Sequence, residues 1–105
     1  AAHGVDSAYL YAASEDCDYR ARMFSPTAGI PEDPATGSAS AILAAQLLMN
    51  GAVADGTTRL TLHQGVEMGR PSTLRLTIEA AGGALTTVRI AGRAVRIGAG
   101  RIRLP

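Results

Sequence analysis

One stretch, residues 37–50, constrains the fold more than any other part of this sequence. Nearly every side chain in it is apolar or small, and polar residues such as Gln46 are too few to form a solvated face. A helix that is apolar on every side has to be surrounded by protein. The sequence therefore predicts one long buried helix, around which the rest of the chain must fold.

Both ends of this helix carry residues that are typical of helix termini. Asp33-Pro34 suits an N-cap followed by the first helical position, because proline lacks only an N–H that the first turn would leave unpaired. Asn50-Gly51 supplies the stop. Backbone N–H groups at a helix start point outward without intrahelical partners, so residues 32–39 are a candidate site for an anion.

Outside the helix, apolar and polar residues alternate, which is typical of strands with one buried face. About six or seven strands are expected. The fold class is therefore α+β, with a strongly curved, mostly antiparallel sheet wrapped round the helix. The expected strands lie within residues 8–12, 19–24, 58–63, 74–78, 88–90, 95–97 and 102–104, and residues 25–31 are expected to form a loop.

The C-terminal strands are expected to form hairpins. Gly82-Gly83 is a turn signal. Beyond it, Val88 and Ile90 are expected to pair with Val95 and Ile97 across a second turn at Gly92-Arg93. Ile102 and Leu104 would then close the sheet.

Length, charge and cysteine content restrict the function. A chain of 105 residues forms one domain, residues 1–105, and a net charge of +1 gives no reason to expect nucleic acid. Cys17 alone cannot form an internal disulfide and is compatible with a reducing cytoplasm. No apolar run reaches the ~18 residues of a membrane span. His3 and His63 have no metal-ligand partners at useful spacing, so we expect a cytoplasmic protein without a metal site.

Several groups of residues carry a resemblance to a known family. They are Arg22-Met23-Phe24, residues 29–39 with the run E-D-P-A-T-G-S-A, then Gln64-Gly65 and the run G-R-P-S at 69–72. In this order they resemble the C-terminal half of the phenazine-biosynthesis-like (PhzF) family. The resemblance implies one half of the diaminopimelate-epimerase-like fold, in which two similar lobes, each a bent sheet around a helix, enclose the active site. It also implies a cofactor-independent isomerase or epimerase, which moves a proton on a small carboxylate-bearing metabolite.

The resemblance further implies roles for the motif residues. Asp33 is the catalytic candidate, as an acid/base group near the migrating proton, and Thr36, Gly37 and Ser38 form the turn that holds the substrate's polar groups. Backbone N–H groups at a helix start suit a carboxylate or a developing enolate. The family's principal acid/base is a glutamate in the N-terminal half, which the resemblance places outside this sequence.

Each of these residues also has a plainer role. Asp33 can be a helix N-cap and nothing more, and residues 36–38 can be only a tight turn. Gln64-Gly65 and residues 69–72 are expected to shape a turn near the cleft, with Arg70 as a weaker candidate for gripping a substrate carboxylate. Glu32 is read as a solvated or ion-paired neighbour, Cys17 as an ordinary apolar residue and His63 as surface.

Two classes of function therefore stay open. The first is a lobe of an isomerase that is completed by an N-terminal lobe or a second chain. Such a chain would be inactive alone and would form a homo- or hetero-oligomer, since half of a two-lobed fold leaves apolar surface uncovered. The alternative is a non-catalytic module that binds small carboxylates, or an interaction domain that pairs through exposed sheet edges.

Overall fold

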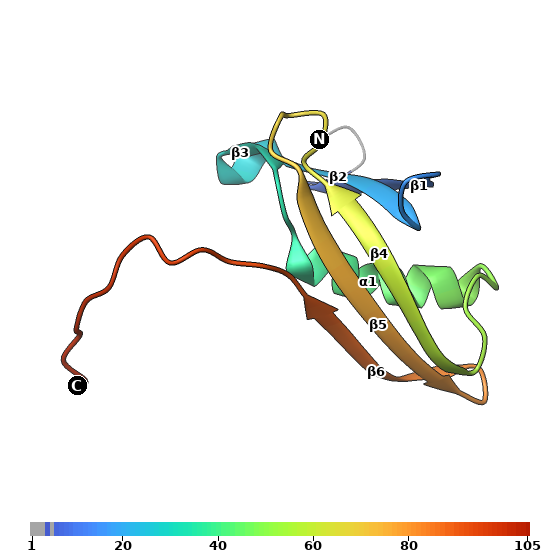
Figure 1. Cartoon of the computed structure of the whole chain (residues 1–105). Helices are drawn as coiled ribbons and strands as arrows, with labels where there is room; N and C mark the ends of the chain where they lie inside the picture. The colour runs from blue at the N-terminus through green and yellow to red at the C-terminus, as the bar shows by residue number, and fades with distance from the viewer. Residues whose placement is uncertain (1–3, 5) are drawn as a thin grey trace.

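A computed structural model describes residue 4 and residues 6–105, and it consists of a twisted sheet with a helix against one face (Figure 1). His3 lies outside the described residues. The α+β class expected from the sequence is confirmed. The strands are β1 (Ala8–Ala13), β2 (Tyr19–Ser25), β3 (Ile30–Asp33), β4 (Gly56–Gln64), β5 (Ser72–Ala81) and β6 (Ala84–Ala91), and the helices are the short 3-10 helix η1 (Pro26–Ala28) and α1 (Gly37–Met49).

The sheet is mixed but mostly antiparallel. Its order is β1-β2-β4-β5-β6, and β3 pairs with β2 beside this path. β2 and β4 run parallel, with Tyr19 opposite Leu62, whereas the other strand pairs in the described part of the chain are antiparallel. A parallel pair needs a long crossover connection. The segment containing β3 and α1 supplies it and thereby places the helix on one face of the sheet.

The core lies between α1 and the inner faces of β4 and β5. Leu43 and Leu47 of the helix belong to the same buried cluster as Leu62, Leu76 and Ile78, and all five side chains are at most 3% exposed. Alternation along β4 and β5 turns these apolar residues toward the helix and their polar neighbours outward, as the sequence pattern predicts. The core is thus a two-layer contact between helix and sheet.

α1 is buried on one side only, which corrects the expectation of a helix enclosed all round. Ala44 is completely buried, whereas Ile42 is 72% exposed and Met49 81% exposed. In the described part of the chain the sheet covers a single face of the helix (Figure 1). Residues 92–105, expected to add further strands, contain none, and after the first of them the chain extends away from the sheet and leaves this face of α1 uncovered (Figure 1).

The extent of α1 and its stop agree with the sequence, whereas the residue that occupies its N-cap position does not. Thr36 occupies the N-cap position, and Asp33 instead ends β3. At the other end Gly51 has a φ of 73°, a left-handed conformation that suits glycine. Its N–H donates to the Leu48 oxygen at 3.1 Å, and that of Ala52 donates to the Leu47 oxygen at 2.9 Å, which together form a Schellman motif.

The pairing expected for the C-terminal third is wrong. β6 pairs with β5 across the Gly82-Gly83 turn, which sets Val88 opposite Ile78 and Ile90 opposite Leu76. This register packs Val88 and Ile90 against the core, which a hairpin through Gly92-Arg93 would not by itself achieve. Residues 92–105 contain no strand. Their large apolar side chains are 84–98% exposed, namely Val95, Ile97, Ile102 and Leu104.

The segment 25–31 is also more ordered than the loop expected from the sequence. Pro26–Ala28 form η1, and β3 begins at Ile30 and pairs with β2.

Among the described residues, no helix has both the length and the apolar character that crossing a membrane requires.

Candidate active site

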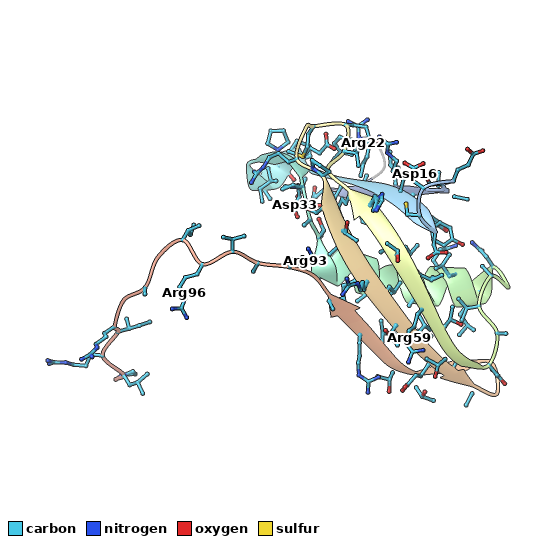
Figure 2. All side chains as sticks on the ribbon, in the orientation of Figure 1. Asp16, Arg22, Asp33, Arg59, Arg93 and Arg96 are labelled. Carbon is cyan, nitrogen blue, oxygen red and sulfur yellow. The ribbon has the colours of Figure 1, made fainter. Side chains whose placement is uncertain are left out.

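The expected site residues gather where β3 leads into α1. Asp33 is the last residue of β3, Thr36 precedes the helix, and Gly37 and Ser38 begin it. Gln64 is the last residue of β4 and reaches the same place through the hydrogen bonds given below. Figure 2 labels Asp33 at this end of the sheet, above the start of α1. Residues far apart in the sequence are thus brought together by the crossover between β2 and β4.

Asp33, Thr36 and Gln64 form one hydrogen-bonded unit. Thr36 Oγ1 donates to Asp33 Oδ2 at 2.5 Å. Gln64 Nε2 donates to the backbone oxygen of Asp33 and to Thr36 Oγ1, both at 2.9 Å, and Gln64 Oε1 accepts from the Thr36 backbone N–H at 3.1 Å. Gln64 is 0% exposed, so solvent does not compete for these bonds. Thr36 therefore holds the Asp33 carboxylate directly, while Gln64 holds the Thr36 hydroxyl and the Asp33 backbone.

The first turn of α1 presents backbone donors that no described residue uses. The N–H of Thr36 is bonded to Gln64, and that of Ser40 closes the first helical turn on the Thr36 oxygen at 3.1 Å. Gly37, Ser38 and Ala39 lie between these two residues, and their N–H groups have no hydrogen-bond partner within the described residues. Such donors favour a negative charge. These unpaired N–H groups directly follow the turn that bonds to Asp33, and anion binding by them stays a prediction.

The same turn is tied to β1 by two residues. Ser40 is fully buried, and its Oγ donates to the Thr36 oxygen at 2.7 Å. The Tyr9 hydroxyl lies 3.2 Å from Ser40 Oγ and must be the donor there, because the Ser40 proton is already directed to Thr36. Burial raises the pKa of Tyr9 above 10.0, and the hydrogen bond with Ser40 partly opposes this shift. Tyr9 therefore stays protonated at neutral pH and anchors the turn to β1.

Gly65 brings the loop after β4 against the motif, and the turn expected at Gln64-Gly65 is present, while its place beside a cleft stays a prediction. Its φ is 78°, a left-handed conformation that disfavours other residues. A β-carbon at this position would collide with the backbone oxygens of Arg70 and Pro34. The Arg70 N–H donates to the Gly65 oxygen at 2.8 Å. Arg70 itself is exposed, so its suggested role with a substrate carboxylate stays a prediction.

Glu32 is an ion-paired neighbour, as expected from the sequence. Arg22 Nε and Nη2 donate to Glu32 Oε2 and Oε1 at 3.2 and 3.0 Å. The hydrogen bond from Arg22 lowers the pKa of Glu32 and raises that of Arg22. Glu67 contacts Arg20 at 2.9 Å and Arg22 at 4.0 Å. These pairs link β2, β3 and the loop after β4, which fixes the strand that ends at Asp33.

A cavity of about 490 Å³ lies beside the start of α1. Of the motif residues 32–39 only Ala35 lines it, whereas Arg75 and Arg93 contribute positive charge and no carboxylate contributes to the lining. Arg93 lies toward the start of the helix in Figure 2. The cavity therefore adjoins the Asp33 site without including it, and its charge suits an anionic group. The described residues contain no group of His, Cys, Asp and Glu side chains that could hold a metal ion.

Comparison with known proteins defines the family. The family model described as phenazine biosynthesis-like protein matches residues 1–100. This chain belongs to that family. A relative described as an uncharacterized isomerase from Mesorhizobium japonicum is 39% identical over 99 residues, which cover 91% of this chain and 33% of the relative. The trans-2,3-dihydro-3-hydroxyanthranilate isomerases of Pseudomonas chlororaphis and Pseudomonas fluorescens are each 43% identical over 86 residues, or 82% of this chain and 31% of theirs.

This phenazine biosynthesis-like chain thus spans about a third of the length of these curated relatives, given the 33% and 31% coverage. Its site also contains parts that sequence reasoning missed. Gln64 was expected only to shape a turn, and Ser40 and Tyr9 were not singled out. A signal for Gln64 was present, because Leu60, Leu62 and Gln64 alternate in phase along β4. That phase turns Gln64 toward the same face as Leu62, which is buried, and Leu60, which is half-buried.

Proposed function

We propose that this chain is the C-terminal lobe of an isomerase or epimerase that moves a proton on a small carboxylate-bearing metabolite. The observation that carries the proposal is the adjacency of the Asp33 carboxylate to the unused N–H groups of the first turn of α1. A carboxylate suits proton transfer, and oriented N–H donors suit the negative charge that builds up when a C–H proton leaves. The names of the Pseudomonas relatives support the same reaction class.

In the proposed reaction a glutamate from the second lobe or chain removes a proton from a substrate carbon, and the electron pair of that bond moves into the adjacent unsaturated system. The proton returns to another carbon, or to the opposite face of the same one, so that the product is an isomer and no cofactor is consumed. Asp33 acts near the migrating proton through Oδ1, because Oδ2 already accepts from Thr36. The N–H groups of Gly37 and Ser38, with the Ser38 hydroxyl, hold the substrate's carboxylate or enolate oxygen.

The proposed architecture is one lobe of the diaminopimelate-epimerase-like fold. Support comes from apolar surface that the described residues leave uncovered. Ile42 and Met49 are exposed on α1, and Val95 and Ile97 are exposed after β6. Exposed apolar patches of this kind mark contacts with other protein segments. We propose that an N-terminal lobe or a second chain covers them and brings the glutamate to the site.

A specific observation also favours a second candidate, a module that binds small carboxylates without chemistry. The cavity beside the site is lined by Arg75 and Arg93, and the first turn of α1 adds N–H donors. Both features attract an anion, and neither of them transfers a proton. The two candidates differ in whether Asp33 is needed for turnover.

The deciding experiment joins this chain to the N-terminal two thirds of the Pseudomonas chlororaphis isomerase, whose name gives the substrate, and follows exchange of substrate C–H protons with deuterated water. Trans-2,3-dihydro-3-hydroxyanthranilate is the substrate probe. We expect exchange by the joined protein and none by this chain alone. Asp33→Asn should lower the rate by about 10²-fold or more, while Asp16→Asn, at an exposed position, should not. Binding without exchange would favour the module, and exchange unaffected by Asp33→Asn would refute the role of Asp33.

A further inference from the structure

We propose that Gln64 is a positioning residue that directs the Thr36 hydroxyl proton to Asp33 Oδ2, and so reserves Oδ1 for the substrate. The inference rests on the proposed role of Asp33 in proton transfer and adds to it a residue that does not touch the substrate. Gln64 acts through Thr36 and through the backbone of Asp33. Three geometric steps lead to this assignment.

The first step is that two backbone groups fix the orientation of the Gln64 amide. The backbone oxygen of Asp33 can only accept a hydrogen bond, and the backbone N–H of Thr36 can only donate one. These groups lie 2.9 and 3.1 Å from the two ends of the amide. The end that faces Asp33 must therefore be Nε2, and the end that faces Thr36 N must be Oε1. A reversed amide would set two acceptors against each other and two donors against each other, in a place without solvent.

The second step is that this orientation fixes the hydroxyl of Thr36. One Nε2 hydrogen bonds to Asp33 O, and the other is directed to Thr36 Oγ1 at 2.9 Å. Thr36 Oγ1 thus accepts from Gln64, and its single proton is left for Asp33 Oδ2 at 2.5 Å. A hydroxyl has one proton to give, so the direction of the whole chain of bonds is set by the backbone groups at its start.

The third step concerns Asp33. Its Oδ2 receives the Thr36 proton, while Oδ1 has no hydrogen bond within the described residues. The two carboxylate oxygens are therefore unequal before any substrate arrives. Fixing one oxygen in this way orients the other. In this arrangement Asp33 meets the substrate with Oδ2 engaged by Thr36 and Oδ1 free in a defined position.

A purely structural role for Gln64 makes a different prediction. If Gln64 only supports the turn, the Thr36 hydroxyl is free to rotate, and losses caused by changes at Gln64 and Thr36 add up. If Gln64 sets the hydroxyl direction, the two residues act as one unit. A change at Gln64 then adds little once the hydroxyl is gone.

The first measurement is proton NMR on the full chain and needs no substrate. We expect a Thr36 hydroxyl proton that exchanges slowly enough to be seen apart from water, with nuclear Overhauser contacts to the Gln64 side-chain amide protons. Thr36→Val should remove this signal and Thr36→Ser should keep it. In Gln64→Met the Thr36 hydroxyl signal should disappear, because the proton then exchanges rapidly with water. The matched control Gln46→Met, on the exposed side of α1, should retain the signal. A hydroxyl signal without contact to the Gln64 amide protons, or with those protons nearest the Thr36 N–H, would overturn the proposal.

The second measurement is turnover by the joined two-lobed protein. Thr36→Val removes the hydrogen bond to Asp33 Oδ2, and Gln64→Met releases the hydroxyl that makes this bond. We expect each variant to lower kcat by about tenfold or more, with little change in KM. The double variant should be no slower than the slower single one. Additive losses, or normal kcat in both single variants while Asp33→Asn is inactive, would refute the positioning role and leave the proposed function standing. Normal kcat in Asp33→Asn would instead refute the proposed function, and the NMR result would be unaffected.

Discussion

Gly65 lies directly against Pro34, so that a β-carbon on Gly65 would stand 2.8 Å from the Pro34 backbone oxygen. Gly65→Ala should therefore destabilise the fold by both a collision and the strain of its left-handed backbone. Gly69 is a matched control, since its φ of 73° is similar and nothing lies within 4 Å of the added carbon. We expect Gly69→Ala to cost about 1–2 kcal/mol and Gly65→Ala clearly more. Denaturant unfolding of both variants measures the difference, and equal losses would contradict the close packing.

Leu43 tests the contact between helix and sheet. Leu43→Ala should lower the free energy of unfolding by about 2–5 kcal/mol, because the side chain is removed from a packed core. Ile42→Ala, one residue earlier and 72% exposed, should change it by less than about 0.5 kcal/mol. Chemical denaturation of the two variants compares the two faces of α1. A loss under ~1 kcal/mol for Leu43→Ala would mean that the helix does not pack as described.

The Arg22–Glu32 pair should make stability depend on pH. Because Arg22 lowers the pKa of Glu32 below 4.5, the folded state holds the charged form more firmly than the unfolded chain does. The pair therefore stabilises the fold fully at pH values above the pKa of Glu32 in the unfolded chain. This stabilisation is lost as the pH falls through the lower pKa that Glu32 has in the folded protein. The unfolding free energy of the wild type should exceed that of Glu32→Gln at pH 7, and the gap should close below about pH 4. Glu15→Gln, at an exposed position, should show no such gap.

The first turn of α1 should bind a small anion weakly. In an NMR titration with malonate or sulfate, we expect the amide signals of Gly37, Ser38 and Ala39 to move, and that of Thr36 to move less because Gln64 already holds it. The attraction at an exposed helix start is only about 0.3–1 kcal/mol. Asp33→Asn should strengthen binding by removing a nearby negative charge. If amides elsewhere move and these three do not, the helix start is no anion site.

The exposed face of α1 should drive association. At low micromolar concentration we expect sedimentation of a species larger than the 10.8 kDa chain, since Ile42 and Met49 present uncovered apolar area. Replacing both by glutamate should return the chain toward a monomer without unfolding it. A compact monomer for the unaltered chain would count against a missing partner surface.

Much of this arrangement can be read from local sequence. The alternation of Leu74, Leu76 and Ile78 predicts which face of β5 is buried, and Asn50-Gly51 predicts where α1 stops. These features depend on near neighbours in the chain, so short-range patterns are enough to predict them.

The rest depends on residues distant in sequence. Asp33 is not the N-cap, because its carboxylate bonds to the Thr36 hydroxyl and the helix begins three positions later than an Asp33 cap predicts. The bond that orients Thr36 comes from Gln64, 28 residues further along. Likewise, the alternation of Val95 and Ile97 identifies apolar side chains, but it does not identify the segment that packs against them. Register between distant segments is decided by packing.

The parallel pairing of β2 with β4 has a consequence for how the site comes into being during folding. Asp33 and Gln64 are joined by a bond that spans 31 residues, and that bond requires the crossover through α1 to have closed. Closing such a loop lowers the entropy of the chain before any stabilising contact has formed. The Asp33 unit is therefore expected to assemble after the helix and after the β5–β6 hairpin, whose contacts are local. A chain shortened before β4 would still carry the whole E-D-P-A-T-G-S-A run, yet its Asp33 and Thr36 would lack the partner that holds them in place.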